Sequence, residues 1–187
     1  MVTPKVVIKE SLKEGLPETY VQNEWDYAVE NDKAFVGAKV FNIASDGSVD
    51  VLFANPSGSG KILKVRLLSV NGGAEGQVDI YGGTYGETGT EDIVRTAAGT
   101  AIDILNKKLG GTSTSVAVFE YGGTYTLNTT SHTENLIPGG SGNFATGGAI
   151  LNGLAGEILE GYGILIRITN NTASAVNYGV RIEWWEE

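Results

Sequence analysis

The sequence predicts an all-β protein, an antiparallel β-sandwich of the jelly-roll type with an extended N-terminal arm. Short apolar runs with a period of two recur from residue 34 to the C-terminus, as expected for strands with one buried face. Turn-forming residues separate these runs, and no stretch shows the periodicity of a long helix. The 187 residues, with 27 glycines, 4 prolines and an apolar fraction of 41%, suit one domain of many short strands.

The first half of the chain supplies strands joined by tight turns. A Ser-Asp-Gly turn at residues 45–47 and an Asn-Gly-Gly turn at residues 71–73 use residues that tolerate positive φ. Residues 86–113 are the least strand-like part, and residues 103–109 are compatible with one or two helical turns. The strands predicted here cover residues 34–43, 49–54, 62–70 and 77–81.

The C-terminal half ends with the two clearest strands, residues 163–169 and 176–184, joined by a polar turn. A strand at residues 115–121, a polar loop at residues 128–135 and a glycine-rich loop at residues 138–148 precede them. Alternation in the last two strands predicts which side chains face the core. These are Ile164, Ile166, Ile168, Val176, Tyr178, Val180 and Ile182.

Residues 1–32 differ in character from the predicted sandwich domain of residues 33–187. They hold 10 of the 35 charged residues and two of the four prolines. We interpret the segment as a charged N-terminal arm or edge segment, in which residues 20–21 and 25–29 pair as an edge strand. A solvated leader is the alternative interpretation.

Residues 55–61, Asn-Pro-Ser-Gly-Ser-Gly-Lys, superficially resemble a phosphate-binding loop. That motif needs glycine where Asn55 stands and a hydroxyl residue where Ile62 stands. It must also open a helix, whereas the residues that follow alternate as a strand. The stretch is therefore predicted to be a turn between two core strands, with Lys61 in solvent.

Composition argues against several classes of function. The formal net charge is −9, and outside the N-terminal region no basic cluster occurs, so neither nucleic acid nor an anionic membrane is an expected partner. The absence of cysteine and a single histidine, His132, argue against a zinc site, and we expect no cofactor. The first residues contain no apolar core of a signal peptide.

No catalytic constellation stands out, and we expect the protein not to be an enzyme. Glu157 and Glu160 are the kind of carboxylates that a glycosidase would use, but their separation across a cleft cannot be read from a sequence. A β-sandwich hydrolase is therefore the least favoured class. Asn128 and Asn170 begin Asn-x-Thr sequences, which we interpret only as exposed loops.

Aromatic residues are the remaining candidates for a binding surface. The pentapeptide Tyr-Gly-Gly-Thr-Tyr occurs at residues 81–85 and again at residues 121–125, and Trp184-Trp185 lies near the C-terminus. Adjacent strand residues face opposite sides, so Trp185 should face outward if Trp184 is buried. The candidate ligand-binding or partner-binding residues on such an aromatic rim are Tyr85, Tyr125, Tyr162 and Trp185. The alternative is that the tyrosines fill the ends of the sandwich and Trp185 covers the second face of its sheet.

Three stretches of the chain carry a resemblance to a known group of proteins. They are LFANPSGSGKIL at residues 52–63, GTAIDILNKKLGGTSTSVA at residues 99–117, and the strand pair at residues 159–184 that ends in Glu-Trp. In this order they resemble small β-sandwich virion structural proteins of tailed phages and related viruses. The resemblance covers most of residues 50–187 and implies a homo-oligomer built into a particle. It implies no catalytic residues for this chain.

We therefore expect a non-enzymatic viral structural protein, a capsid decoration, tail or fibre component that self-assembles through a β-sandwich. Its expected partners are further copies of itself, as in a trimer, and other virion proteins, and its expected location is the virion. The alternative is a carbohydrate-binding module that holds a surface glycan on the aromatic rim.

Overall fold

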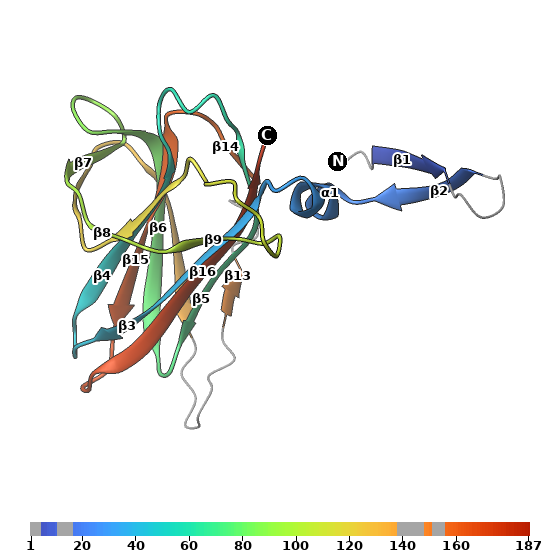
Figure 1. Cartoon of the computed structure of the whole chain (residues 1–187). Coiled ribbons are helices and arrows are strands. Elements are labelled where there is room, and N and C mark those ends of the chain that lie inside the picture. The colour runs from blue at the N-terminus through green and yellow to red at the C-terminus, as the bar shows by residue number, and fades with distance from the viewer. Residues whose placement is uncertain (1–4, 11–16, 138–147, 151–155) are drawn as a thin grey trace.

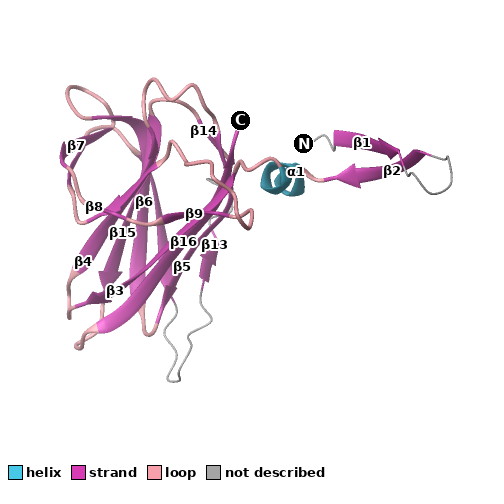
Figure 2. Cartoon of the chain, in the orientation of Figure 1, coloured by secondary structure: helices cyan, strands magenta, loops and turns pink. Residues whose placement is uncertain are grey.

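The computed structural model describes residues 5–10, 17–137, 148–150 and 156–187, and these contain two packed β-sheets, one short helix beside them and a separate two-stranded hairpin (Figures 1 and 2). The predicted antiparallel β-sandwich is therefore confirmed. The larger sheet contains β4 (Ser48–Asn55), β6 (Gly76–Gly86), β7 (Ile93–Ala97), β8 (Thr100–Ala101), β10 (Val118–Tyr121), β11 (Thr124–Leu127), β12 (Ser131–Ile137) and β15 (Tyr162–Asn170). The smaller sheet contains β3 (Ala34–Ile43), β5 (Leu63–Gly72), β9 (Ile104–Asn106), β13 (Gly148–Ile150), β14 (Glu157–Ile158) and β16 (Val176–Glu186).

Eight of these strands are connected as a jelly roll. Taken in chain order, they pair first with last, second with seventh, third with sixth and fourth with fifth, as when one long antiparallel hairpin is rolled up. The pairs are β3–β16, β4–β15, β5–β13 and β6–β12. The rolled strands give the orders β3-β16-β5-β13 and β4-β15-β6-β12 in the two sheets.

The main core lies between the sheets and follows the predicted alternation. Ile164, Ile166 and Ile168 of β15 are buried, as are Tyr178, Val180 and Ile182 of β16, while Val176 is partly buried. Trp184 lies fully buried among aromatic rings, with its ring centroid 4.9 Å from that of Phe53. Period-two patterning therefore assigns these residues to the core correctly.

An insert between β6 and β12 adds β7 to β11 and a second, smaller core. Leu52, Ala54 and Leu165 point away from the main core but are fully buried, because the insert covers them on the outer face of the larger sheet. This explains why Ile164, Leu165 and Ile166 are apolar in succession, as is typical of strands buried on both faces.

The N-terminal region differs from the predicted edge strand at residues 25–29. A hairpin of β1 (Lys5–Glu10) and β2 (Pro17–Gln22) is followed by helix α1 (Glu24–Glu30), which contains those residues. Asn23 caps the helix, since its Oδ1 accepts from the Asp26 backbone N–H at 2.8 Å. In Figure 1 the hairpin lies beyond α1 and apart from the two sheets.

Three further predictions of local structure can be compared with the fold. Residues 103–109 contain strand β9 rather than helical turns, because residues 104–106 pair with β3. Most of the predicted polar loop at residues 128–135 is strand β12, which pairs with β6. The predicted glycine-rich loop falls largely on residues 138–147, outside the described residues. The turn at residues 45–47 is confirmed, with Asp46 at φ 55°.

Candidate functional site

Tyr85 is buried and Tyr125 is half-buried, and both lie beside the smaller core. Tyr85 is only 6% exposed and belongs to the smaller core with Leu52 and Leu165. Tyr125 is half-buried on β11, and its hydroxyl donates a hydrogen bond to Glu120 Oε1 at 3.0 Å. Tyr85 is therefore too buried to stack on a sugar, whereas the partly buried Tyr125 is held by Glu120.

The two tyrosines border a closed cluster around the buried Glu120. Arg95 Nη1 lies 3.1 Å from Glu120 Oε2, and Arg95 also pairs with Glu87. Burial raises the pKa of Tyr85, and burial together with the nearby Glu120 charge raises the pKa of Tyr125. The phenols stay protonated at neutral pH, and the cluster joins β7, β10 and β11 within the insert.

Trp185 faces outward from β16 as predicted, but helix α1 covers it. Its ring lies 6.1 Å from that of Trp25 in an edge-on arrangement, and the Arg66 guanidinium stacks 4.5 Å from the Trp25 ring. The Trp185 indole N–H is buried without a hydrogen-bond partner among the described residues. Trp185 therefore serves to seat α1 on the smaller sheet.

Tyr162 is the one predicted rim residue of the four that is substantially exposed, at 45%. It lines a shallow groove of about 420 Å³ together with Gly82, Gly83 and Leu159. The structure therefore separates the four candidates, since two border the Glu120 cluster, one lies under α1 and one lies in this groove.

The loop that resembles a phosphate cradle binds a carboxylate of the chain itself. The backbone N–H groups of Gly58 and Gly60 donate to the two oxygens of Glu160, at 2.5 and 3.1 Å. Both glycines have positive φ, which turns their amides toward the same anion. The predicted turn between β4 and β5 is confirmed, and Lys61 beside it is half-buried rather than free in solvent.

The acids considered for glycoside hydrolysis are engaged in internal contacts. Glu160 accepts from the loop amides, and Glu157 Oε1 lies 3.4 Å from Lys64 Nζ. Asn170, which begins one of the Asn-x-Thr sequences, is fully buried rather than exposed. Its amide group donates to the carbonyls of Ile43, Ala44 and Ser174, at 2.7 to 3.0 Å.

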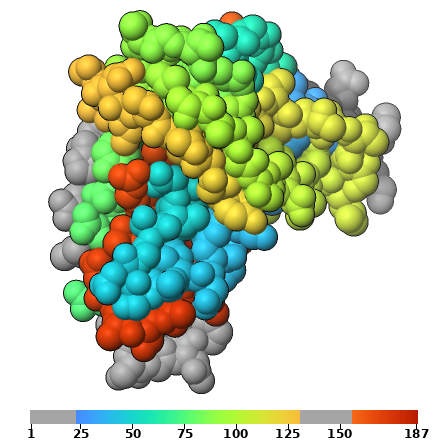
Figure 3. Space-filling model, turned by 90° about the vertical axis from the view of Figure 1, so that its left-hand side faces the viewer, coloured from blue at the N-terminus to red at the C-terminus, as the bar shows by residue number. Residues whose placement is uncertain are grey.

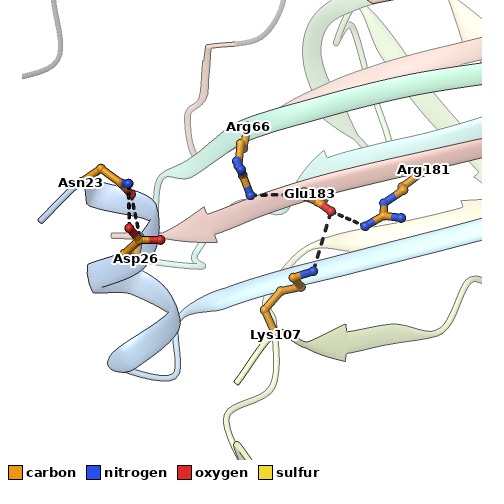
Figure 4. A network of polar contacts seen from close by, with 6 residues as sticks. All are labelled: Asn23, Asp26, Arg66, Lys107, Arg181 and Glu183. Atoms are coloured by element: carbon orange, nitrogen blue, oxygen red, sulfur yellow. Dashed lines mark hydrogen bonds and ion pairs between the residues drawn. The ribbon is translucent and has the colours of Figure 1, made fainter. Parts of the chain in front are cut away.

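A charged network occupies the outer face of the smaller sheet near α1 (Figure 4). Glu183 of β16 is 5% exposed and accepts hydrogen bonds from Arg66 Nη1 at 3.3 Å and from Arg181, and it forms an ion pair with Lys107 Nζ at 3.8 Å. Three cations from different elements thus surround one buried carboxylate. The three cations compensate the charge of the buried Glu183 carboxylate, and the network joins β5, β16 and the segment after β9.

The free part of the β3 edge is a feature that the sequence analysis did not identify. Strand β9 pairs with β3 only at residues 35–37, and Val40 beyond it is 65% exposed. Figure 3 shows this side, with the insert in green and yellow above and the β3–β4 region in blue and cyan uncovered below it. A strand at residues 34–43 was predicted, but its neighbours in the sheet could not be.

Within the described residues, no group of three or more histidine, cysteine or acidic side chains is placed to hold a metal ion. The same residues contain no helix long and apolar enough to span a membrane. No protein-family model, curated protein or solved structure matches the chain.

Proposed function

We propose that this protein is a non-enzymatic structural component of a virus particle, a capsid decoration, tail or fibre subunit that assembles with copies of itself. The observation that carries the proposal is the β1–β2 hairpin, which stands beyond α1 as a two-stranded unit (Figure 1). A two-stranded hairpin is marginally stable alone in water. Adding it to another surface would stabilise it, and a neighbouring subunit offers such a surface.

The jelly-roll fold and the motif resemblance support the same proposal. Jelly rolls serve both as viral capsid domains and as lectin domains, so the fold alone does not choose between the two candidate functions. Two of the three virion-like motifs fall on jelly-roll elements: residues 55–61 form the turn between β4 and β5, and the last motif covers β15 and most of β16, whereas the motif at residues 99–117 lies in the insert. The viral setting is supported by this resemblance.

The test of assembly is the oligomeric state of the full-length chain. We expect light scattering and sedimentation velocity to find a discrete oligomer, or a larger ring or filament, over a wide range of concentrations. A monomer throughout that range would contradict self-assembly. Genes for capsid or tail proteins on either side of this gene would support the viral setting, and a metabolic operon would count against it.

A carbohydrate-binding module remains the second candidate, through Tyr162 and its groove. If it is correct, a glycan array gives reproducible hits that Tyr162→Ala abolishes. The matched control is Leu105→Ala, which removes another exposed apolar side chain, 64% exposed, away from the groove. A blank array with intact protein would leave this candidate without support.

A further inference from the structure

The insert covers most of one open side of the jelly roll. It adds β10 and β8 to the edge of β4 in the larger sheet, and β9 to the edge of β3 in the smaller sheet. Strand β9 pairs only with residues 35–37 of β3, whereas β3 itself extends to Ile43. Residues 38–42 of β3 therefore have a strand neighbour on one side only, among the described residues.

Two hydrogen bonds at the start of β3 show which backbone groups of residues 38–42 are free. Lys107 N–H donates to the Ala34 carbonyl on the β9 side, and Glu186 N–H donates to the Lys33 carbonyl on the β16 side. Because successive residues of a strand direct their backbone groups to opposite edges, even-numbered residues face the β9 side. The free N–H and C=O groups are thus those of Ala38, Val40 and Asn42.

Two of the usual devices that block a sheet edge, a β-bulge and a proline, are missing from this segment. Its pairing with β16 runs without a register shift from residue 34 to residue 43, and it contains no proline. The segment carries one inward-pointing charge, Lys39, whose Nζ lies 5.4 Å from the centre of the Tyr121 ring of the other sheet. The backbone groups of the edge itself are not interrupted by a bulge or a proline, and such an edge can accept another strand.

We propose that this free edge binds strand β1 of the hairpin of a second copy, which extends the smaller sheet by β-strand addition. The inference rests on the proposed self-assembly and names its contact. Strand β1 has six residues, enough to span residues 38–42, and among the described strands it pairs with β2 alone. Strand β2 begins with Pro17, which lacks an N–H donor, and so β1 is the better donor strand.

The placement of the hairpin makes the contact intermolecular. In Figure 1 the hairpin extends on the side of α1, whereas the free end of β3 points to the opposite side of the sandwich. Each copy then offers one hairpin and one edge, which is a head-to-tail contact. Such contacts generate closed rings or open filaments according to the rotation between subunits.

Two full-length variants that each disable one half of the contact test the proposal. Val40→Pro removes a free-edge N–H without touching the β16 side, where odd-numbered residues bond. Val7→Pro combined with Ile8→Pro removes an N–H from both edges of β1, because adjacent residues face opposite edges. We expect both variants to be monomeric, and an equimolar mixture to form a dimer in which one intact hairpin meets one intact edge.

Controls separate this contact from misfolding and from other modes of assembly. Asn42→Pro should reproduce the Val40→Pro result, and near-ultraviolet circular dichroism should show an intact sandwich in each variant. Leu105→Lys, at a side chain as exposed as Val40, should assemble like the wild type.

Each other outcome has a distinct meaning. If wild type and both variants all form the same oligomer, the proposed contact is wrong while self-assembly stands. If Val40→Pro is monomeric but the mixture stays monomeric, the edge pairs with something other than β1, such as the same edge of a second copy, and the proposal is wrong. A monomeric wild type would contradict the proposed function together with this inference.

Discussion

Asn170 is the residue whose polar contacts most strongly join separate parts of the sandwich. Its amide donates to three carbonyls, and its Oδ1 accepts from Thr172 N–H at 3.0 Å and from the Tyr178 hydroxyl at 3.1 Å. The Asn170 side chain makes these hydrogen bonds in a fully buried position at the end of β15. A buried polar group that is fully satisfied costs little, but its removal leaves several partners unsatisfied.

We expect Asn170→Ala to lower the free energy of unfolding by about 3 kcal/mol or more, because several buried groups lose their partners at once. Urea denaturation monitored by tryptophan fluorescence measures this change. Asn171→Ala, at the exposed neighbouring position, is the matched control and should change stability by less than about 0.5 kcal/mol. Equal effects of the two substitutions would show that the Asn170 contacts contribute little.

Tyr125 gives the fold a dependence on alkaline pH. Burial and the Glu120 charge raise its pKa in the folded state above the unfolded value of about 10. Above that pH the unfolded chain releases the proton while the folded chain retains it, so stability falls as pH rises from about 10 through the folded pKa. Below pH 10 this group contributes no such dependence.

The expected measurement is a series of urea unfolding curves at increasing alkaline pH. The free energy of unfolding of Tyr125→Phe should decline with pH less steeply than that of wild type. That of Tyr162→Phe, which removes an exposed phenol, should follow wild type. Some decline should remain in Tyr125→Phe, because burial also raises the pKa values of Tyr85 and Tyr178. Identical slopes for wild type and Tyr125→Phe would contradict the assignment.

Helix α1 is an element whose order depends on its contacts with the sandwich. It has seven residues, too few for an isolated helix to be stable in water, and only Ala28 is buried in it. The main side-chain contacts that fix it are those of Trp25 with Trp185 and Arg66. The sandwich core, by contrast, contains none of these side chains.

We expect Trp25→Ala to release α1 and expose Trp185, with little change in the thermal midpoint of the sandwich. Trp185 emission should shift to the red, best recorded in a Trp184→Phe background, and amide exchange in residues 24–30 should accelerate. Glu30→Ala, at an exposed position of the same helix, should leave the spectrum unchanged. A large drop in the thermal midpoint with Trp25→Ala would instead make α1 part of the folding core.

The sequence predicts an element where the residues next to one another along the chain decide its structure. The alternation in β15 and β16 assigns their core faces, and the glycines at residues 58 and 60 mark a turn. Strands β8 and β9 are two and three residues long, and they exist because β10 and β3 lie beside them. Helix α1 is too short to reveal a periodicity of 3.6.

The repeated pentapeptide shows the limit of local inference. At residues 81–85 it lies within strand β6, whereas at residues 121–125 it turns between β10 and β11 with Gly122 at φ 69°. The same five residues thus adopt two different backbone conformations, because pairing with distant strands decides the backbone. The aromatic rim was overestimated for a similar reason, since the insert and α1 that cover Tyr85 and Trp185 lie elsewhere in the chain.

At the scale of the whole molecule, the charge of −9 opposes the association of identical copies. Salt screens this repulsion, with a Debye length of about 8 Å at physiological ionic strength. We therefore expect assembly to strengthen between low and physiological salt, as measured by sedimentation equilibrium. The thermal midpoint at each salt concentration is the control, and assembly that weakens with salt would indicate a contact dominated by opposite charges.

The order of the jelly-roll strands also governs how the chain can reach its fold. From β3 to β6, and again from β15 to β16, each connection crosses from one sheet to the other. Consecutive strands there are not neighbours, so no early hairpin can template either sheet. The central pairs β4–β15 and β3–β16 join residues more than a hundred positions apart, and large loops must close before they form. Refolding should therefore be slow, because the first strands of the sandwich must pair with its last strands. The rate-limiting step of folding should then follow the synthesis of β16.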